Sequence, residues 1–165
     1  MCAGSSVCIL LASREADRYR DEYLALLDHL GPESAEWPSR PVLEQMSNGR
    51  QPRVNLSIKA SALASPFDSI DPEGSLTSAG NRLREIFRLA RRLGAFINLD
   101  MEQYATKDLV LSLFKKLLSE PEFRDWPDVG IAIQAYLRET DNDLHDLLKW
   151  VRARGTPITV RLVKG

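Results

Sequence analysis

Four side chains that could bind a charged or polar ligand stand at similar places in this sequence, each at or near the end of a strand-like run. They are Lys59, Asp100, Gln134 and Arg161. The Arg161 guanidinium is a planar fork that suits an anion or the polar edge of a ring, whereas the Lys59 ammonium is a point charge that suits a carboxylate. Asp100 and Gln134 could orient a ring or a second side chain. Because an unpaired buried charge is costly, such a set is kept either by mutual ion pairs or by a ligand.

A structural salt-bridge network explains any one of these residues as well as a binding role does. Four of them on successive strands favour a site. Other candidates fit less well, since His29 and His145 fall on expected helices among polar neighbours and Glu102 lies one step beyond a strand, where we expect exposure. The sequence contains none of the common phosphate-loop, dinucleotide, zinc-protease or serine-hydrolase motifs.

Alternating strand-like and helix-like patterns must position the four residues. Strand patterns cover residues 54–59, 95–100, 130–136 and 157–164, and amphipathic helical patterns lie between them. Thr140 to Asp143 resembles a capping box at the start of the last helix. Such alternation is typical of right-handed βαβ units and a parallel sheet, in which the carboxyl ends of the strands share one edge.

The two faces of the expected sheet differ in polarity. Alternate positions form an apolar face: Val54, Leu56, Ile58, Ile97, Leu99, Ile131, Ile133, Val160 and Leu162. The positions between them are largely polar: Asn55, Ser57, Lys59, Asn98, Asp100, Glu102, Gln134, Tyr136, Thr159, Arg161 and Val163. A sheet that is covered by helices on both sides should be apolar on both. The pattern therefore favours a (β/α) barrel with a site at its carboxyl-end mouth, with a flavodoxin-like sheet as the competing architecture.

The N-terminal third of the chain is less regular. We expect Ser13 to cap a helix that reaches about Leu30 and is ended by Gly31-Pro32. Residues 1–12 contain no Lys or Arg, which argues against an export signal. Residues 31–53 are rich in Pro and Gly and are expected to form a long connection.

Composition excludes several classes of protein. The chain has 165 residues, a net charge of −1, 44% hydrophobic and 27% charged residues, which are values of an ordinary globular domain. The net charge is near zero, whereas domains that bind nucleic acid usually carry an excess of basic residues. No apolar run is long enough to span a membrane. Cys2 and Cys8 are too few for a disulfide scaffold or a four-ligand zinc site, so we expect reduced thiols in a cytoplasmic protein.

Four blocks of sequence carry a resemblance to a known family. The blocks NLSIKASAL, INLDMEQY, GIAIQAYLR and VRLVKG, in this order and spacing, resemble the proline dehydrogenase domain of bacterial proline-utilisation flavoenzymes. The resemblance runs from about residue 14 to residue 165. It implies a distorted (β/α)8 barrel that binds FAD non-covalently and oxidises L-proline to Δ1-pyrroline-5-carboxylate in proline catabolism. It also implies a quinone as electron acceptor, a fused or adjacent aldehyde dehydrogenase domain, and a cytoplasmic or membrane-peripheral location.

The resemblance also assigns roles to the residues at the strand ends. Lys59 would contact the substrate carboxylate, and Asp100 would lie beside both flavin and substrate. Gln134 would hydrogen-bond the flavin ring, and Arg161 would lie near its N5 atom. Lys59, Asp100 and Arg161 would thus be the catalytic residues. The other implied cofactor contacts are Met101, Val163, Lys164 and Gly165.

The sequence also departs from the family pattern. In the family a first barrel strand precedes the first helix, and three strands and an arginine-bearing helix follow the last block. Residues 1–12 do not resemble that strand, so we expect residues 13–165 to hold about strands two to five of eight. A complete barrel needs about 250 residues. We therefore expect a truncated chain that binds FAD weakly and lacks activity, with a non-enzymatic interaction module or a barrel enzyme for another small carboxylate as alternatives.

Overall fold

A parallel four-stranded sheet forms the centre of the molecule. The structure is a computed structural model, which describes residues 3–46 and 49–164, so that Cys2 and Gly165 lie outside it. The strands are β3 (Asn55–Lys59), β4 (Phe96–Asp100), β5 (Val129–Gln134) and β6 (Thr159–Val163). They pair in parallel in the order β3-β4-β5-β6. Each expected strand is present, with ends within two residues of those expected.

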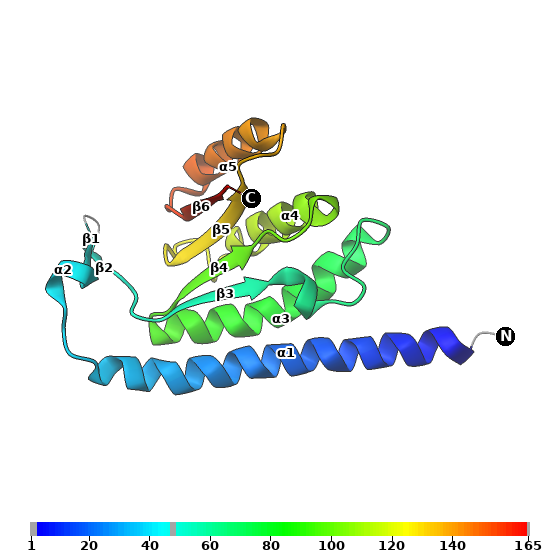
Figure 1. Ribbon diagram of the computed structural model, residues 1–165, viewed down its shortest axis with the longest axis horizontal. Coiled ribbons are helices and arrows are strands. Elements are labelled where there is room, and N and C mark those ends of the chain that lie inside the picture. The colour runs from blue at the N-terminus through cyan, green and yellow to red at the C-terminus, as the bar shows by residue number, and fades with distance from the viewer. Residues whose placement is uncertain (1–2, 47–48, 165) are drawn as a thin grey trace.

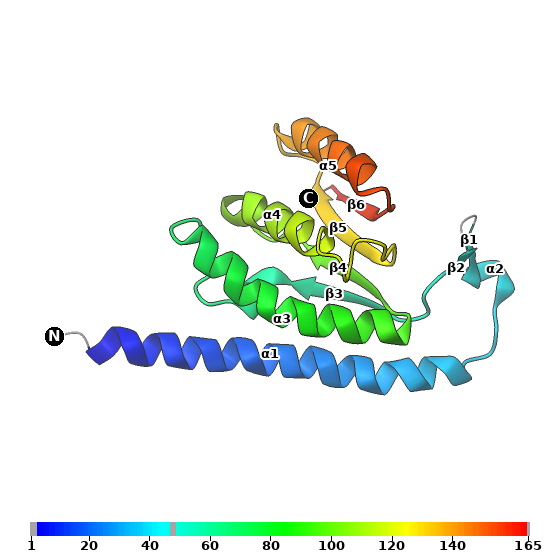
Figure 2. The same ribbon diagram turned by 180° about the vertical axis from the view of Figure 1, so that it is seen from behind.

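Three helices connect the strands and lie on one face of the sheet. They are α3 (Pro72–Leu93), α4 (Lys107–Leu118) and α5 (Thr140–Arg154) (Figures 1 and 2). A flavodoxin-like sheet would have a strand order that departs from the chain order, and helices on both faces. The barrel-type architecture is therefore confirmed over the four strands, half the number in a complete (β/α)8 barrel. We call the side opposite the three helices the uncovered face.

The core lies between the sheet and the three helices. The apolar strand positions are buried or half-buried except Leu162, which is 59% exposed because β6 is an edge strand. Phe87 packs edge-on against Phe123 and Trp126, with ring centroids 5.6 and 5.4 Å apart. Such pairs add to the stabilisation that the buried area already gives. The apolar periodicity read from the sequence thus predicts the face that the helices cover.

Helix α1 (Ala3–Glu36) is much longer than expected and lies beside α3 (Figure 1). The predicted start at Ser13 and the predicted end before Pro32 are both wrong. Pro32 has no backbone N–H and therefore favours the end of a helix. A carbonyl oxygen in the last turn of α1, however, accepts a hydrogen bond from a residue elsewhere in the chain. The Arg53 guanidinium donates to the Ser34 carbonyl oxygen at 2.7 Å. This distant residue caps the carbonyl end of the helix, and the local sequence gives no sign of it.

The connection after α1 contains small elements of its own. Helix α2 (Pro41–Glu44) precedes an antiparallel hairpin of β1 (Gln45–Met46) and β2 (Gly49–Arg50). These elements lie apart from the main sheet (Figures 1 and 2). Within residues 3–46 and 49–164, no helix combines the length and the apolar character needed to cross a membrane.

A buried arginine fixes the loop that leads into β5. The Arg154 guanidinium donates to the carbonyl oxygens of Leu118, Phe123 and Trp126 at 3.1, 2.9 and 2.7 Å. Burial lowers the pKa of Arg154, and nearby Asp125 acts in the opposite direction. The loop carries backbone acceptors that would otherwise be buried without a donor. Arg154 therefore holds the start of β5 against the end of α5.

We expect Arg154→Met to lower the free energy of unfolding by about 3 kcal/mol, because buried carbonyl oxygens lose a charged donor. Urea denaturation followed by circular dichroism measures the loss. Arg152→Met is the matched control, since Arg152 is exposed on the same last turn of α5. A loss below about 1 kcal/mol for Arg154→Met, as for an ordinary surface change, would contradict this role.

Candidate functional site

The register of the sheet brings the four predicted residues to one edge. Lys59 lies directly opposite Asp100, and Gln134 lies directly opposite Val163. Arg161 precedes Val163 by two residues and so points to the same face of β6. The predicted gathering of Lys59, Asp100, Gln134 and Arg161 at the carboxyl ends of the strands is what the structure has.

An ion pair between Asp100 and Arg161 links β4 to β6 on the uncovered face. Asn98 donates from its side-chain amide to the same Asp100 oxygen at 3.0 Å. The Arg161 guanidinium also reaches the Ser57 hydroxyl oxygen at 3.5 Å, at the limit of a hydrogen bond. Arg161 of β6 thus reaches across β5 to Asp100 of β4 and toward Ser57 of β3.

A second ion pair joins the last residue of β3 to the loop that follows β4. The Lys59 ammonium lies 3.0 Å from one Glu102 carboxylate oxygen, and the Ser61 hydroxyl donates to the other oxygen. Glu102 raises the pKa of Lys59 above its ordinary value through this hydrogen bond and through its charge. Glu102 is an exposed residue, as the sequence predicts, and its side chain is 29% exposed. It pairs with Lys59 all the same, and we call Lys59, Asp100, Glu102 and Arg161 the charged edge.

Gln134 is held from both sides. Its side-chain amide donates to the Met101 carbonyl oxygen at 3.1 Å, and the Thr140 hydroxyl donates to the Gln134 carbonyl oxygen at 2.6 Å. The predicted capping box at Thr140 is therefore wrong, because this hydroxyl bonds back to β5 instead of to the helix.

Nearby, the buried ammonium of Lys107 contacts both oxygens of Asp143 at 2.7 and 2.8 Å. This pair ties the first turns of α4 and α5 together beside Gln134.

Tyr23 of α1 is a member of this region that sequence reasoning missed. Burial raises the pKa of Tyr23, and the carboxylates of Asp100 and Glu102 raise it further, whereas the backbone and the charge of Lys59 act in the opposite direction. Tyr23 lies within the helix expected over residues 13–30, and the sequence pattern predicted no role for it at the end of the sheet.

The predicted cofactor contacts at the end of β6 are only partly described. Val163 is half-buried, and its carbonyl oxygen accepts a hydrogen bond from the Ala135 amide at 2.8 Å. Lys164 is exposed just beyond the strand. Gly165 lies outside the described residues, so its role stays a prediction from the sequence.

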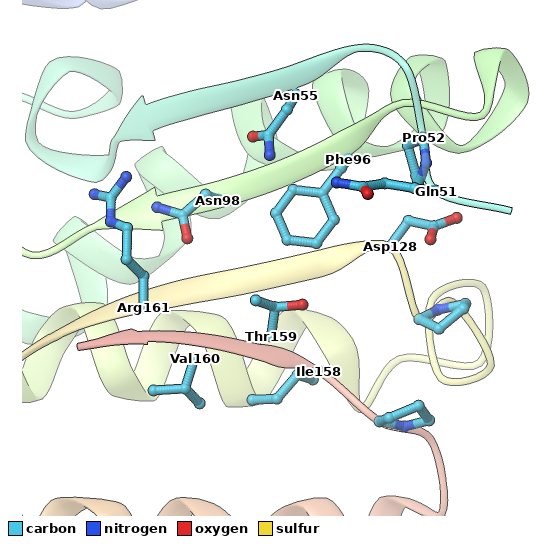
Figure 3. A pocket seen from close by; sticks show the side chains of 12 residues that line it. Gln51, Pro52, Asn55, Phe96, Asn98, Asp128, Ile158, Thr159, Val160 and Arg161 are labelled. Atoms are coloured by element: carbon cyan, nitrogen blue, oxygen red, sulfur yellow. The ribbon is translucent and has the colours of Figure 1, made fainter. Parts of the chain in front are cut away.

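An open pocket of about 370 Å³ lies on the uncovered face, toward the amino ends of the strands (Figure 3). Asn55, Asn98 and Thr159 contribute polar groups to its lining, and Arg161 joins the pocket to the charged edge. The Phe96 ring lies so close to Gly130 that an added Cβ would be 2.8 Å from the ring. Gly130 is therefore required for this ring position, and strand alternation alone did not reveal it.

Asp128 lines the same pocket and is half-buried. Burial raises the pKa of its carboxyl group above the ordinary value. A raised pKa in the folded state means that the charged form opposes folding, so stability falls as the pH rises through the folded-state pKa.

We expect Asp128→Asn to stabilise the chain at pH 7, because the amide removes the half-buried charge. The gain is small, below about 1 kcal/mol, since water screens a group that is only half-buried. It should vanish near pH 3, where the wild-type carboxyl is protonated in both states. Thermal unfolding at both pH values tests this, with the exposed Asp146→Asn as control. An equal effect of Asp128→Asn at both pH values would refute the assignment.

The charged edge can hold a ligand that has both a carboxylate and a planar ring with polar atoms along one side. Lys59 suits the carboxylate, and the Gln134 amide and the Arg161 guanidinium suit ring acceptors. A flavin ring fits this donor set. Among residues 3–46 and 49–164, no group of three or more His, Cys, Asp or Glu side chains is placed to hold a metal ion.

Known proteins match the chain over most of its length. The family model described as proline dehydrogenase matches residues 7–165. The bifunctional protein PutA of Klebsiella aerogenes and that of Escherichia coli are each 31% identical to it over 121 residues, which is 72% of this chain and 9% of each relative.

Solved structures give the same result. The crystal structure of proline utilization A (PutA) from Bdellovibrio bacteriovorus, inactivated by N-propargylglycine, has a TM-score of 0.89 and 40% identity, over 93% of this chain and 16% of that one. PutA from Corynebacterium freiburgense has a TM-score of 0.72 and 30% identity, over 93% and 14%. The chain thus spans a small part of these relatives. Sequence blocks, strand order and family match agree, and the chain belongs to the proline dehydrogenase family.

Proposed function

We propose that this chain supplies part of the flavin and substrate site of an FAD-dependent proline dehydrogenase. The observation that carries the proposal is the gathering of Lys59, Asp100, Gln134 and Arg161 at one edge of a barrel-type sheet. This gathering occurs in a chain of the proline dehydrogenase family. When bound, FAD would accept a hydride from the L-proline ring carbon that is next to nitrogen and does not bear the carboxylate, and the nitrogen would lose a proton to water, which leaves Δ1-pyrroline-5-carboxylate.

The residues of the chain would bind and orient the two partners of this reaction. Lys59 would hold the substrate carboxylate, and Gln134 would hydrogen-bond the polar edge of the flavin ring. Arg161 would place a fixed positive charge where negative charge develops, because it pairs with Asp100, which the Asn98 amide holds in turn. Met101, Val163, Lys164 and Gly165 would complete the cofactor contacts of this segment.

The four-stranded sheet supports little activity by itself in this proposal. Both outer strands, β3 and β6, present unpaired backbone groups, and the polar uncovered face meets water instead of a closed barrel interior. The isolated chain would therefore bind FAD weakly and would need further strands for catalysis. A quinone acceptor, a linked aldehyde dehydrogenase domain and a cytoplasmic location belong to the same proposal, supported by the resemblance to bifunctional relatives.

A segment exchange tests the proposal directly. The part of Bdellovibrio bacteriovorus PutA that aligns with this chain is replaced by residues 7–165, and the chimaera is assayed for bound flavin and for proline-dependent dye reduction. We expect a flavin-bound, active chimaera. Arg161→Met in it should lower kcat/KM by at least about 100-fold, because a preorganised charge is lost.

Two controls accompany this experiment. Lys149→Met, which removes an exposed cation on α5, should leave activity unchanged, and the isolated chain with added FAD should not reduce the dye. A folded, flavin-bound chimaera without activity, or full activity of Arg161→Met, would contradict the proposal.

A further inference from the structure

A ring of contacts joins the carboxyl ends of β4 and β5 to the first turns of α4 and α5. The Gln134 side-chain amide donates to the Met101 carbonyl oxygen, and the Thr140 hydroxyl donates to the Gln134 carbonyl oxygen. The ion pair of Lys107 with Asp143 joins the two helices. The backbone between these residues closes the ring, so that the position of Gln134 depends on each of its links.

The Lys107–Asp143 pair does not serve α4 itself. Lys107 is the first residue of this helix, where the helix dipole disfavours a cation. Its side chain is nevertheless only 9% exposed, and its ammonium contacts Asp108, which is 88% exposed, as well as Asp143, which is 15% exposed. The buried partner of Lys107 is therefore the one on the other helix. A lysine at this position stabilises the junction of α4 with α5.

The first turn of α5 depends on the same pair. Glu139, which precedes the helix, forms no side-chain cap hydrogen bond, and the Thr140 hydroxyl is directed to β5. Because neither side chain caps the helix, contacts with other elements must hold this turn. Loss of the Lys107–Asp143 pair would therefore loosen the turn that carries Thr140 and, through Thr140, the end of β5.

The Gln134 amide has a defined direction only while this ring holds. Its bond to Met101 uses one of the two amide N–H groups, so the other N–H and the amide oxygen can face a ligand. A side chain that is fixed in advance loses little conformational entropy when a ligand binds. The space between Gln134 and the Lys107–Asp143 pair is too small for a water molecule, so the pair acts on Gln134 through the protein and not by touching a ligand.

We infer that Lys107 is a positioning residue: by binding Asp143 it fixes the end of β5 relative to the loop after β4, and so holds the Gln134 amide where it can hydrogen-bond the flavin ring. The inference rests on the proposed function, which assigns Gln134 to the flavin. Lys107 and Asp143 are helix residues outside the implied cofactor contacts. Their loss should weaken flavin binding although Gln134 itself is unchanged, because the amide is no longer preorganised.

A double variant separates positioning from stability. Lys107→Met/Asp143→Leu replaces the ion pair with apolar side chains, a change that often leaves a protein as stable as before. It also removes the two short bonds that set the distance between the helices. If the pair served stability alone, this variant would behave as the wild type does. If the pair positions Gln134, the amide is freed although the fold is kept.

The first readout needs no flavin. NMR of the 165-residue chain gives the rate at which the Gln134 side-chain amide protons exchange with water, and urea unfolding gives the stability of each variant. We expect the double variant to unfold near the wild-type urea midpoint and its Gln134 amide to exchange about tenfold faster, the factor for one lost hydrogen bond. Asp143→Asn keeps the side-chain size and removes the charge, so it should also raise the rate, and it decides the test if the double variant does not fold.

The second readout is flavin binding by the chimaera described above. The dissociation constant for FAD should rise about tenfold in the double variant, and the flavin absorption bands should shift, because the ring loses an oriented hydrogen bond. Lys116→Met/Asp146→Leu makes the same two changes at exposed positions of the same helices. This control should keep the wild-type exchange rate, FAD affinity and absorption.

The outcomes distinguish this inference from the proposed function. Wild-type exchange of the Gln134 amide in the folded double variant, or in folded Asp143→Asn, overturns the role of Lys107 and leaves Gln134 as a flavin contact. Faster exchange with unchanged FAD affinity and absorption also overturns it, because the direction of the amide then does not matter to the flavin. A chimaera that folds without flavin overturns the proposed function and the inference with it.

Discussion

The in-register parallel pairing of β3, β4, β5 and β6 is the constraint on which the rest of the structure depends. It sets Lys59 opposite Asp100 and lets Arg161 reach back across the sheet to the same carboxylate. Because strand side chains alternate, a slip of one residue would turn these charges into the helix layer. Ile58 and Leu99, buried on the opposite face, oppose such a slip. The apolar core therefore holds the chemistry-bearing residues in place.

The apolar periodicity of the sequence predicts the four-stranded sheet and the residues at the carboxyl ends of its strands. It does not predict the contacts between distant segments. Strand-like runs with a period of two, separated by amphipathic helical runs, predict four parallel strands and the face of the sheet that the helices cover. The continuation of α1 beyond Pro32 is supported by Arg53, which caps its last turn from another part of the chain. Glu102 joins the site through Lys59, and Phe96 takes its position only because Gly130 lacks a side chain. These contacts depend on distances in three dimensions, which no local pattern contains.

The charged edge and the uncovered face are consistent with a family site that is formed partly by this four-stranded segment and partly by further strands. The four strands orient Gln134 and Arg161 and pair the charges of the edge with one another. The pocket on the uncovered face is open and polar, and Leu162 is exposed at the edge of β6. A surface of this kind suits the inside of a closed barrel more than contact with water. In our proposal, this segment provides prearranged polar groups, and further strands would enclose them around the flavin.

The central claim is that four strands alone bring the ends of β4 and β6 together, and a double-mutant cycle on Asp100 and Arg161 tests it most directly. The free energy of unfolding is measured for the wild-type chain, Asp100→Asn, Arg161→Met and the double variant, at low salt. We predict a favourable coupling of about 0.5–1 kcal/mol, the range for a partly exposed ion pair with a further hydrogen bond. Additive effects of the two changes would show that the side chains do not interact and would contradict this account.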